Sequence, residues 1–215
     1  MTNSTRRDVL AAGVALAGAT AGCLTGSSDT AESPAPTPTG ETLPTPVAGD
    51  PDADVTVAVY EDYACPHCKT YSVEVYPQVE AAFLEDGSVR YEFHDFPIPV
   101  DEAVSWQAAS AARAVQDEAG DAAFFTYSKR LFENQASLGP SVYAELTEGI
   151  DADGETVRRA ADEERYRPTV AADRQAGIDR GVEGTPTVFV DGDPVEWSRV
   201  AFEPIREAVE AARGT

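Results

Sequence analysis

Two cysteines separated by two residues carry the most reactive side chains of this sequence. Cys65 and Cys68 enclose Pro66 and His67, and two thiols at this spacing can form and break one disulfide bond reversibly. A purely structural disulfide is a poor explanation, because a bridge that closes so short a loop removes little entropy from the unfolded chain. The pair therefore predicts redox chemistry, with the Cys65–Cys68 disulfide itself as the redox centre and no separate cofactor.

Metal binding is the second chemistry that cysteine and histidine can support. Structural zinc sites usually have four protein ligands, and besides the two sulfurs the chain offers only His67 and His94. His67 lies inside the pair and cannot easily join both sulfurs in one tetrahedron. We therefore expect no metal at this site, and a non-catalytic, metal-carrying protein is kept as an alternative to be tested.

The residues around the pair predict how its first sulfur is positioned. Residues 55–60 are rich in β-branched side chains and predict a buried strand. Pro66 suits the first position of a helix, where its missing N–H group costs nothing, and this helix is expected to reach Glu85 with a kink or interruption at Pro77. Cys65 would then lie at a helix N-terminus, where free N–H groups and the helix dipole stabilise a thiolate.

The strand, the Cys-Pro-His-Cys sequence and the helix together resemble the DsbA-like branch of the thioredoxin superfamily, whose oxidases often carry this tetrapeptide. Residues 89–97 resemble its second strand, residues 103–135 the start of its helical insertion, and residues 181–192 its cis-proline loop and following hairpin. The most specific feature is Cys-Pro-His-Cys followed about 120 residues later by Gly-Thr-Pro-Thr. Over residues 52–212 the resemblance implies an α/β thioredoxin fold (β-α-β … β-β-α) with an inserted helical subdomain.

This resemblance implies a role for each residue of the site. Cys65 is expected to be the exposed, reactive sulfur and Cys68 the resolving partner, while His67 favours the Cys65 thiolate. Pro186 is expected to follow a cis peptide bond and to face the sulfurs, with the backbone of Thr185 free to pair with an extended substrate peptide. The expected site residues are Cys65, Cys68, His67 and Pro66 for catalysis, and Thr185 and Pro186 for substrate binding.

One position departs from the pattern of the family. The strand residue six before the first cysteine is often acidic there and helps to move protons at the buried cysteine, but here it is Val59. Glu61 and Asp62 are close in sequence, and strand alternation puts only one of them on any given face. The sequence leaves open which acid, if either, serves as the proton relay.

Helices are expected between the second strand and the proline loop. Apolar residues at 104, 108, 111 and 115 recur at spacings of 4, 3 and 4, which is typical of one helix face. The remaining expectations are helices at 124–131, 142–150, 155–166 and 168–181, strands at 188–190 and 195–197 around a turn at 191–192, and a last helix from Pro204 to Gly214.

The first 49 residues predict an export signal followed by a tether. Arg6 and Arg7, followed by an apolar run at 11–21, indicate a twin-arginine signal, because the run is far shorter than the ~20 residues of a membrane span. Small residues before Cys23 resemble a lipobox, so Cys23 is expected to carry lipid, although a conventional cleavage site is the alternative. The expected parts are a signal peptide at 1–22, a Ser/Thr/Pro-rich tether at 23–49 and a domain at 50–215 with its helical insertion at about 100–180.

Composition limits the partners of this chain. It has 16 basic and 38 acidic residues, a net charge of -22, and such a surface repels nucleic acid and anionic lipid head groups. Only two of the basic residues are lysines. The composition suggests adaptation to molar salt, where the Debye length shrinks to about 3 Å; an ordinary acidic exported protein is the alternative.

Together these features predict a monomeric, extracytoplasmic thiol–disulfide oxidoreductase that oxidises the thiols of exported proteins. Lipid on Cys23 would hold it at the outer side of the cytoplasmic membrane. The resemblance implies a membrane quinone-linked enzyme as the partner that reoxidises it. A reductase or isomerase of the same fold is the closest alternative, because the Cys-Pro-His-Cys motif alone does not determine the redox potential.

Overall fold

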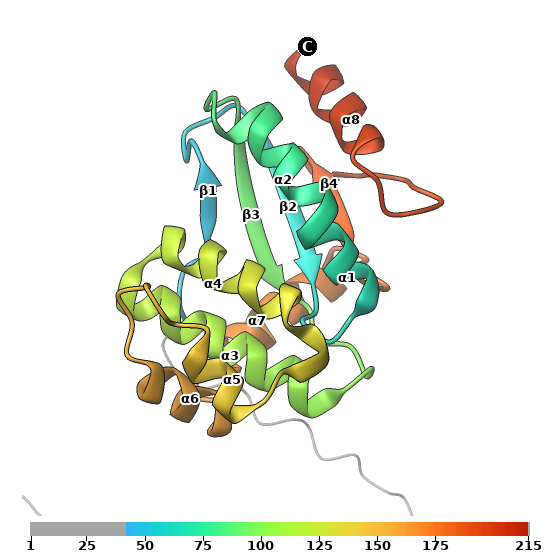
Figure 1. Cartoon of the computed structure of the whole chain (residues 1–215). Coiled ribbons are helices and arrows are strands. Elements are labelled where there is room, and N and C mark those ends of the chain that lie inside the picture. Colours follow the sequence, from blue (N-terminus) through green and yellow to red (C-terminus); the bar gives the residue numbers. More distant parts are fainter. Residues whose placement is uncertain (1–41, 215) are drawn as a thin grey trace, which may run out of the picture. The chain divides into compact units, whose positions relative to one another are not determined.

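The computed structural model describes residues 42–214, so the expected signal peptide, Cys23 and most of the tether lie outside the described residues. Five strands form one sheet in the order β1-β3-β2-β4-β5 (Figure 1). The central pair β2 and β3 is parallel, and every other neighbouring pair is antiparallel. The strands are β1 (Val47–Gly49), β2 (Val55–Glu61), β3 (Val89–Asp95), β4 (Thr187–Val190) and β5 (Asp193–Pro194).

A long helical segment after β2 covers one face of the sheet, together with α8 (Glu203–Arg213). It runs through α1 (Pro66–Thr70), a π-helical turn (Tyr71–Val75), α2 (Tyr76–Val79) and a second π-helical turn (Glu80–Leu84). The expected interruption near Pro77 is confirmed, because a proline cannot donate the hydrogen bond that a regular α-helix needs at that point.

The expected helical insertion lies between β3 and β4. It contains α3 (Glu102–Ala119), α4 (Asp121–Glu133), a short 3₁₀ turn (Gln135–Ser137), α5 (Pro140–Glu145), α6 (Gly154–Asp162) and α7 (Arg167–Asp179). Helix α7 packs on β3 at the second face of the sheet. Gly177 allows this close approach, since a Cβ atom there would come within 2.9 Å of the rings of Phe96 and Tyr60. Within residues 42–214, no helix is long and apolar enough to cross a membrane.

The side chains of β2 alternate between the two faces of the sheet, as a strand requires. Val55, Val57 and Val59 join the main core beneath the helical segment that contains α1 and α2. Tyr60 points the other way, into a smaller cluster with Phe96, Val182 and Phe189. The next residue, Glu61, therefore belongs to the face that carries the main core and α1.

The chain joins the sheet earlier than predicted, so the boundary at residue 50 is wrong. Residues 47–49, expected in the tether, form β1 and pair with β3. Leu43 N–H donates to Thr169 Oγ1 (3.1 Å), and Val47 N–H donates to Asp121 Oδ2 (3.0 Å). Proline cannot donate a hydrogen bond to a neighbouring strand, but it is tolerated in and near edge strands. Pro44 and Pro46 therefore argued against a strand in the sequence, although this short edge strand follows them.

The second strand of the C-terminal hairpin is also placed differently from the prediction. Asp191 and Gly192 form the expected turn with φ of 48° and 93°, but β5 is Asp193–Pro194 rather than 195–197. Val195 N–H still donates to Val188 O (2.8 Å). Beyond it the chain leaves the sheet, so Trp197 does not join a ladder but packs near Tyr71 and lines a groove with His67 and Pro186.

Candidate active site

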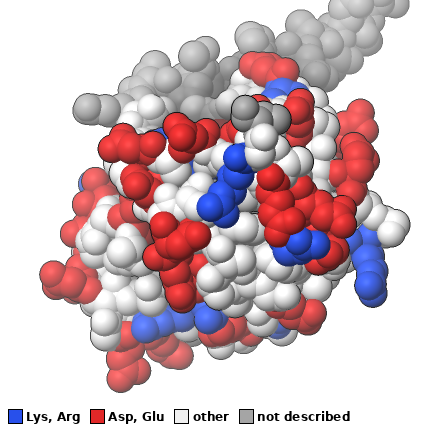
Figure 2. Space-filling model, turned by 90° about the horizontal axis from the view of Figure 1, so that it is seen from above, with Lys and Arg blue, Asp and Glu red and all other residues white. Residues whose placement is uncertain are grey.

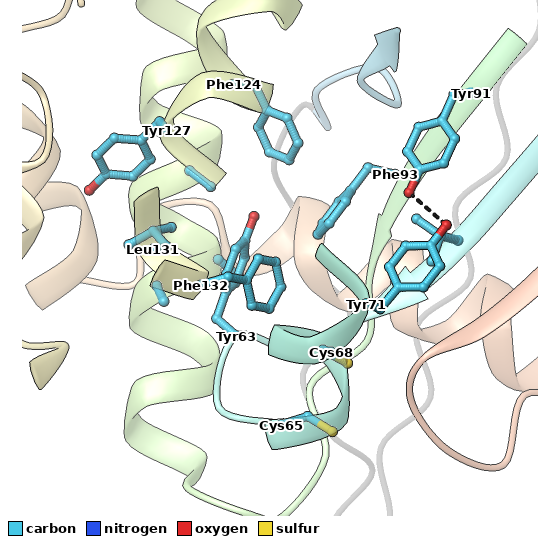
Figure 3. Close-up of a cluster of buried hydrophobic side chains, with 14 of the residues drawn as sticks. Tyr63, Cys65, Cys68, Tyr71, Tyr91, Phe93, Phe124, Tyr127, Leu131 and Phe132 are labelled. Carbon is cyan, nitrogen blue, oxygen red and sulfur yellow. Dashed lines mark hydrogen bonds between the residues drawn. The ribbon is translucent and has the colours of Figure 1, made fainter. Parts of the chain in front are cut away.

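Cys65 is placed at the start of α1 by the short turn that follows β2. Its N–H donates to Asp62 O (3.0 Å), and its backbone is extended with φ −79° and ψ 122°, as expected for the residue that precedes a helix. Pro66 occupies the first helical position, as predicted. Figure 3 shows Cys65 at the end of this helix and Cys68 one turn further along it.

Both cysteines are free thiols in the structure, and both are buried. Cys68 is fully buried and Cys65 is only 4% exposed, so the expectation of an exposed Cys65 is wrong. The loop around Pro186 explains the difference, because Cys65 Sγ donates to Thr185 O at 3.4 Å. Cys68 Sγ accepts a hydrogen bond from Asp62 N–H, also at 3.4 Å.

The loop that covers Cys65 has the predicted cis peptide bond between Thr185 and Pro186. Pro186 is buried. The Thr185 carbonyl accepts the hydrogen bond of Cys65 only from the protonated thiol, so it is free of the sulfur's proton when Cys65 is a thiolate or part of the disulfide. A surface groove lies beside the loop and is lined by His67, Thr70, Thr185, Pro186, Trp197, Ser198, Arg199 and Val200.

The two sulfurs have opposite acid–base behaviour. The pKa of Cys65 is lowered to about 5, mainly because the Cys68 thiol donates a hydrogen bond to its sulfur. Burial opposes this shift, whereas the side chain of Thr185 and the backbone N–H groups of Cys68 and His67 add to it. Burial raises the pKa of Cys68 well above its ordinary value. One thiolate is therefore stabilised at a position next to a thiol that stays protonated.

His67 supports this thiolate through its backbone. The residue is exposed, as is Pro66, and its N–H group is among the donors that lower the pKa of Cys65. Among the described residues, the ring of His67 makes no hydrogen bond to the Cys65 sulfur, so its role in stabilising the thiolate stays a prediction. His67 also lines the groove beside Pro186, where its ring is available to a bound peptide.

The two acids that follow β2 take different positions. Asp62 organises the turn, since its carboxylate accepts hydrogen bonds from Ala64 N–H (2.8 Å), Ile98 N–H (2.7 Å) and Ser105 Oγ–H (2.9 Å). Glu61 shares the face of Val59 and is 2% exposed, with both carboxylate oxygens near Ser72 Oγ (3.1 and 2.9 Å). Burial raises the pKa of Glu61 well above its ordinary value, so Glu61 can hold a proton near the buried sulfur. Burial also raises the pKa of Asp62, but the three hydrogen bonds to its carboxylate oppose that rise.

Gln135 is a site residue that the sequence pattern did not identify. Its side-chain amide donates to Tyr63 O (2.8 Å) and to Cys65 O (2.9 Å), and so fixes the turn before α1 from the 3₁₀ turn that follows α4 in the helical insertion. Tyr63 is held in addition by stacking on Phe132, with ring centroids 4.7 Å apart, and by a hydroxyl contact with Ser128 (3.0 Å). No local sequence signal links positions so far apart in the chain.

The second histidine of the chain lies away from the cysteines. His94 stacks on Tyr60 with ring centroids 4.7 Å apart, and its ring nitrogens lie 3.6 Å from Glu92 and 3.5 Å from Asp173. In the part of the chain that the structure describes, no group of three or more His, Cys, Asp or Glu residues is arranged to hold a metal ion.

Comparison with known proteins places this geometry in a family. The profile of the family described as thioredoxin matches residues 41–211. Disulfide bond formation protein D of Bacillus subtilis is 28% identical over 171 residues, which cover 77% of this chain and 75% of the relative. The Na⁺/H⁺ antiporter NhaA 3 of Salinispora tropica is 31% identical over 146 residues, which cover 68% of this chain but only 21% of the antiporter.

Solved structures agree with this assignment. Oxidised BdbD from Bacillus subtilis has a TM-score of 0.73 and 26% identity, covering 80% of this chain and 94% of that chain. DsbA from Chlamydia trachomatis has a TM-score of 0.64 at 21% identity, covering 79% of this chain and 91% of that chain, and shows the common fold. The chain described here therefore belongs to the thioredoxin family.

Proposed function

We propose that this chain is a thiol–disulfide oxidoreductase that oxidises pairs of substrate thiols through Cys65 and Cys68. The observation that carries the proposal is the asymmetry of the pair, in which the pKa of Cys65 is lowered to about 5 while burial raises that of Cys68. The name of the Bacillus subtilis relative, disulfide bond formation protein D, supports the same direction.

The reaction begins with the disulfide form of the pair. A substrate thiolate attacks the Cys65 sulfur, the Cys65–Cys68 bond breaks, and Cys68 leaves as a thiolate that must be protonated because it is buried. A second substrate thiolate then attacks the substrate sulfur of the mixed disulfide, which forms the substrate disulfide and releases Cys65 as a thiolate. We assign Pro66 and His67 to the support of this thiolate, and Thr185 and Pro186 to the binding of an extended substrate segment.

The lowered pKa of Cys65 favours the oxidising direction. A thiol whose pKa falls from 9.0 to about 5 stabilises the reduced protein at neutral pH by about 3 kcal/mol. For a two-electron couple this raises the reduction potential by about 60 mV. The reductase and isomerase alternatives call for a lower potential, so the pair is better suited to accept electrons from substrates.

Location and partners are part of the same proposal. The twin-arginine signal at 1–22 and lipid on Cys23 would place the domain outside the cytoplasmic membrane, on a tether that ends near residue 42. There it would oxidise exported proteins as a monomer and be reoxidised by a membrane quinone-linked enzyme. Replacing Cys23 with Ser should move the protein from the membrane fraction to the soluble fraction, and an unchanged membrane fraction would count against the lipid anchor.

Substitution of the reactive sulfur tests the proposed chemistry. The purified full chain in its disulfide form should oxidise a reduced dithiol peptide, and Cys65→Ser should abolish this activity. Cys23→Ser is the matched control, because it removes a cysteine outside the pair and should leave the rate unchanged. Oxidation at the original rate by Cys65→Ser would refute the proposal.

A further inference from the structure

Glu61 borders a small, partly open cavity beneath the surface of the molecule. The cavity has a volume of about 10 Å³, close to the ~10–15 Å³ that one water molecule needs. Glu61, Ser72, Ser128 and Lys129 line it, together with Tyr76, Tyr91, Phe93 and Phe125, so that most of its wall is apolar. Two to four polar partners are what a buried water requires, so this cavity is suited to hold a water molecule against the Glu61 carboxyl group.

The same cavity adjoins a groove on the surface. The groove lies between β1, α2 and α4, and it shares Tyr76, Phe125 and Lys129 with the cavity. Lys129 is exposed and Phe125 is half-buried, so the shared residues lead from solvent to the interior. None of the residues of this groove lines the groove beside Cys65 and Pro186, and Figure 1 shows β1 and α4 on the opposite side of the helical segment from α8.

Glu61 needs a route to solvent that does not pass Cys65, because the face that carries Cys65 is covered during the reaction. In the mixed disulfide the substrate covers Cys65, whose sulfur is already beneath the Thr185–Pro186 loop. At that stage Cys68 has left as a thiolate and takes up one proton, and Glu61 becomes a carboxylate if it supplies that proton. Glu61 must then regain a proton from water, and reoxidation of the pair sends one proton in the reverse direction.

We propose that Glu61 exchanges protons with solvent through this cavity and the groove between β1, α2 and α4, independently of the face that carries Cys65. The inference rests on the proposed function and adds Glu61 as the proton carrier for Cys68, with Ser72 as its positioning residue. Tyr76, Phe125 and Lys129 line both the cavity and the groove, and we take this shared stretch as the narrow point of the route. The titratable or charged groups around Glu61 are Cys65, Cys68, Tyr63, Tyr71, Tyr76, Tyr91, Asp95 and Lys129.

Infrared spectroscopy on the reduced full chain tests the route without any redox turnover. At about pH 5 the carbonyl band of protonated Glu61 is identified by its loss in Glu61→Gln, and its shift after transfer to D₂O reports proton exchange. Alkylation of Cys65 with N-ethylmaleimide blocks access to the pair through the groove beside Pro186. N-ethylmaleimide can also label Cys23, but Cys23 lies outside the proposed route. Exchange should be as fast in the alkylated protein as in the free protein. If alkylation of Cys65 stops the exchange, the proposal is overturned.

A matched pair of substitutions on α4 locates the route. Phe125→Trp enlarges a side chain at the narrow point, whereas Ala122→Trp adds the same ring to the groove but not to the cavity. We expect several-fold slower exchange for Phe125→Trp and no change for Ala122→Trp. Equal rates in both variants and the original chain would contradict the route, as would equal slowing in both. Because exchange needs no catalysis, these results are separate from the activity of Cys65→Ser.

Glu61→Gln adds a kinetic measurement. Rapid-quench reduction of the disulfide form by a small dithiol should slow by about 100-fold or more, the usual contribution of one acid–base group. Val59→Glu combined with Glu61→Gln restores a carboxyl group to the same face of β2 and should recover part of the rate. An unchanged rate in Glu61→Gln would show that Cys68 obtains its proton elsewhere.

Discussion

Cys65 and Cys68 are one helical turn apart, yet their surroundings stabilise different protonation states. Cys65 meets backbone N–H groups at the start of α1 and the Cys68 thiol as a donor, whereas Cys68 is enclosed by the core and near the buried Glu61. A thiolate is a good leaving group when its pKa is low, and a disulfide that contains such a sulfur is easily reduced. The direction of the reaction therefore depends on a few contacts around one atom.

Substitutions at Cys68 and His67 should separate side-chain from backbone effects on the pKa of Cys65. We expect Cys68→Ala to raise the pKa of Cys65 from about 5, because the hydrogen bond from the Cys68 thiol makes the largest contribution. His67→Ala should change this pKa much less, since alanine keeps the backbone N–H group. The pH dependence of the alkylation rate of Cys65 measures both, at low salt and in molar salt. A larger effect for His67→Ala would show that the imidazole stabilises the thiolate.

At the scale of elements, the site depends on an insertion helix that holds the turn before α1. Gln135 follows α4 and connects to the carbonyl groups of Tyr63 and Cys65, and Asp62 connects the same turn to Ile98 and Ser105 at the start of the insertion. Buried carbonyl and carboxylate groups that lose such partners destabilise the fold. The helical insertion thus keeps the first turn of α1 in position from two sides.

Removal of the Gln135 amide should loosen this turn. Gln135→Ala should lower the free energy of unfolding by about 1–3 kcal/mol, the usual effect of leaving buried acceptors without donors. Gln175→Ala is the matched control, because Gln175 is bonded only to the exposed Asp179 on its own helix. Denaturant unfolding of both variants provides the measurement. If Gln135→Ala were as stable as Gln175→Ala, the turn before α1 would not depend on the hydrogen bonds from Gln135.

The sequence predicts the elements that have strong local signals. Strand β2 follows from its β-branched residues, α1 from Pro66, and α8 from Pro204 and the periodic apolar positions, and all three are found near the predicted bounds. Helix α5 ends at Glu145 and α6 at Asp162, earlier than predicted, where Gly149 and Glu164 adopt positive φ values. Periodicity continues through such turns and does not reveal them.

The parts of the site that the sequence did not predict depend on tertiary contacts. The role of Glu61 follows from its shared face with Val59 and from Ser72, which lies on the helix packed above it. The burial of Cys65 comes from a loop more than a hundred residues away. Strand β1 is three residues long and is held by Asp121 and by pairing with β3. Each of these requires the folded arrangement of distant segments.

At the scale of the whole molecule, a buried charge network joins the end of β3 to the helical insertion. The Arg113 side chain is fully buried and donates to Asp95 (2.7 Å) and Asp173 (2.5 Å). It also reaches Pro44 O (3.3 Å), just before β1. His94 extends the network between Asp173 and Glu92. A buried charge that lost its partners would be strongly destabilising, so the network ties the entry of the chain to α3, α7 and β3.

His94 makes the stability of this network depend on pH. Burial lowers the pKa of His94, but the carboxylates of Asp173 and Glu92 outweigh burial and raise it above the ordinary 6.5. Its stabilisation is therefore complete below about pH 6.5 and is lost as pH rises through the raised folded-state pKa. His94→Gln should remove this loss from the unfolding free energy, while His67→Gln should keep it. Identical pH profiles for the original chain and His94→Gln would contradict the assignment.

The acidic surface predicts how the molecule responds to salt. Figure 2 shows Asp and Glu side chains spread over the face viewed, with few Lys or Arg side chains between them. A net charge of -22 opposes the compact state, while exposed pairs such as Arg158–Glu155 contribute little because water and salt screen them. The unfolding free energy should rise from low to molar sodium chloride. A decrease would contradict our proposal that the protein is adapted to high salt.

The reduction potential of the Cys65–Cys68 pair tests the proposed oxidising function most directly. Purified protein is equilibrated with glutathione buffers of known ratio, and the fraction of reduced pair is measured after the thiols are trapped. We predict a potential above about −150 mV, in the range of disulfide-forming oxidants. A potential below about −230 mV would place the pair among reductants and would contradict the proposal that Cys65 is held as a stabilised thiolate in order to accept electrons.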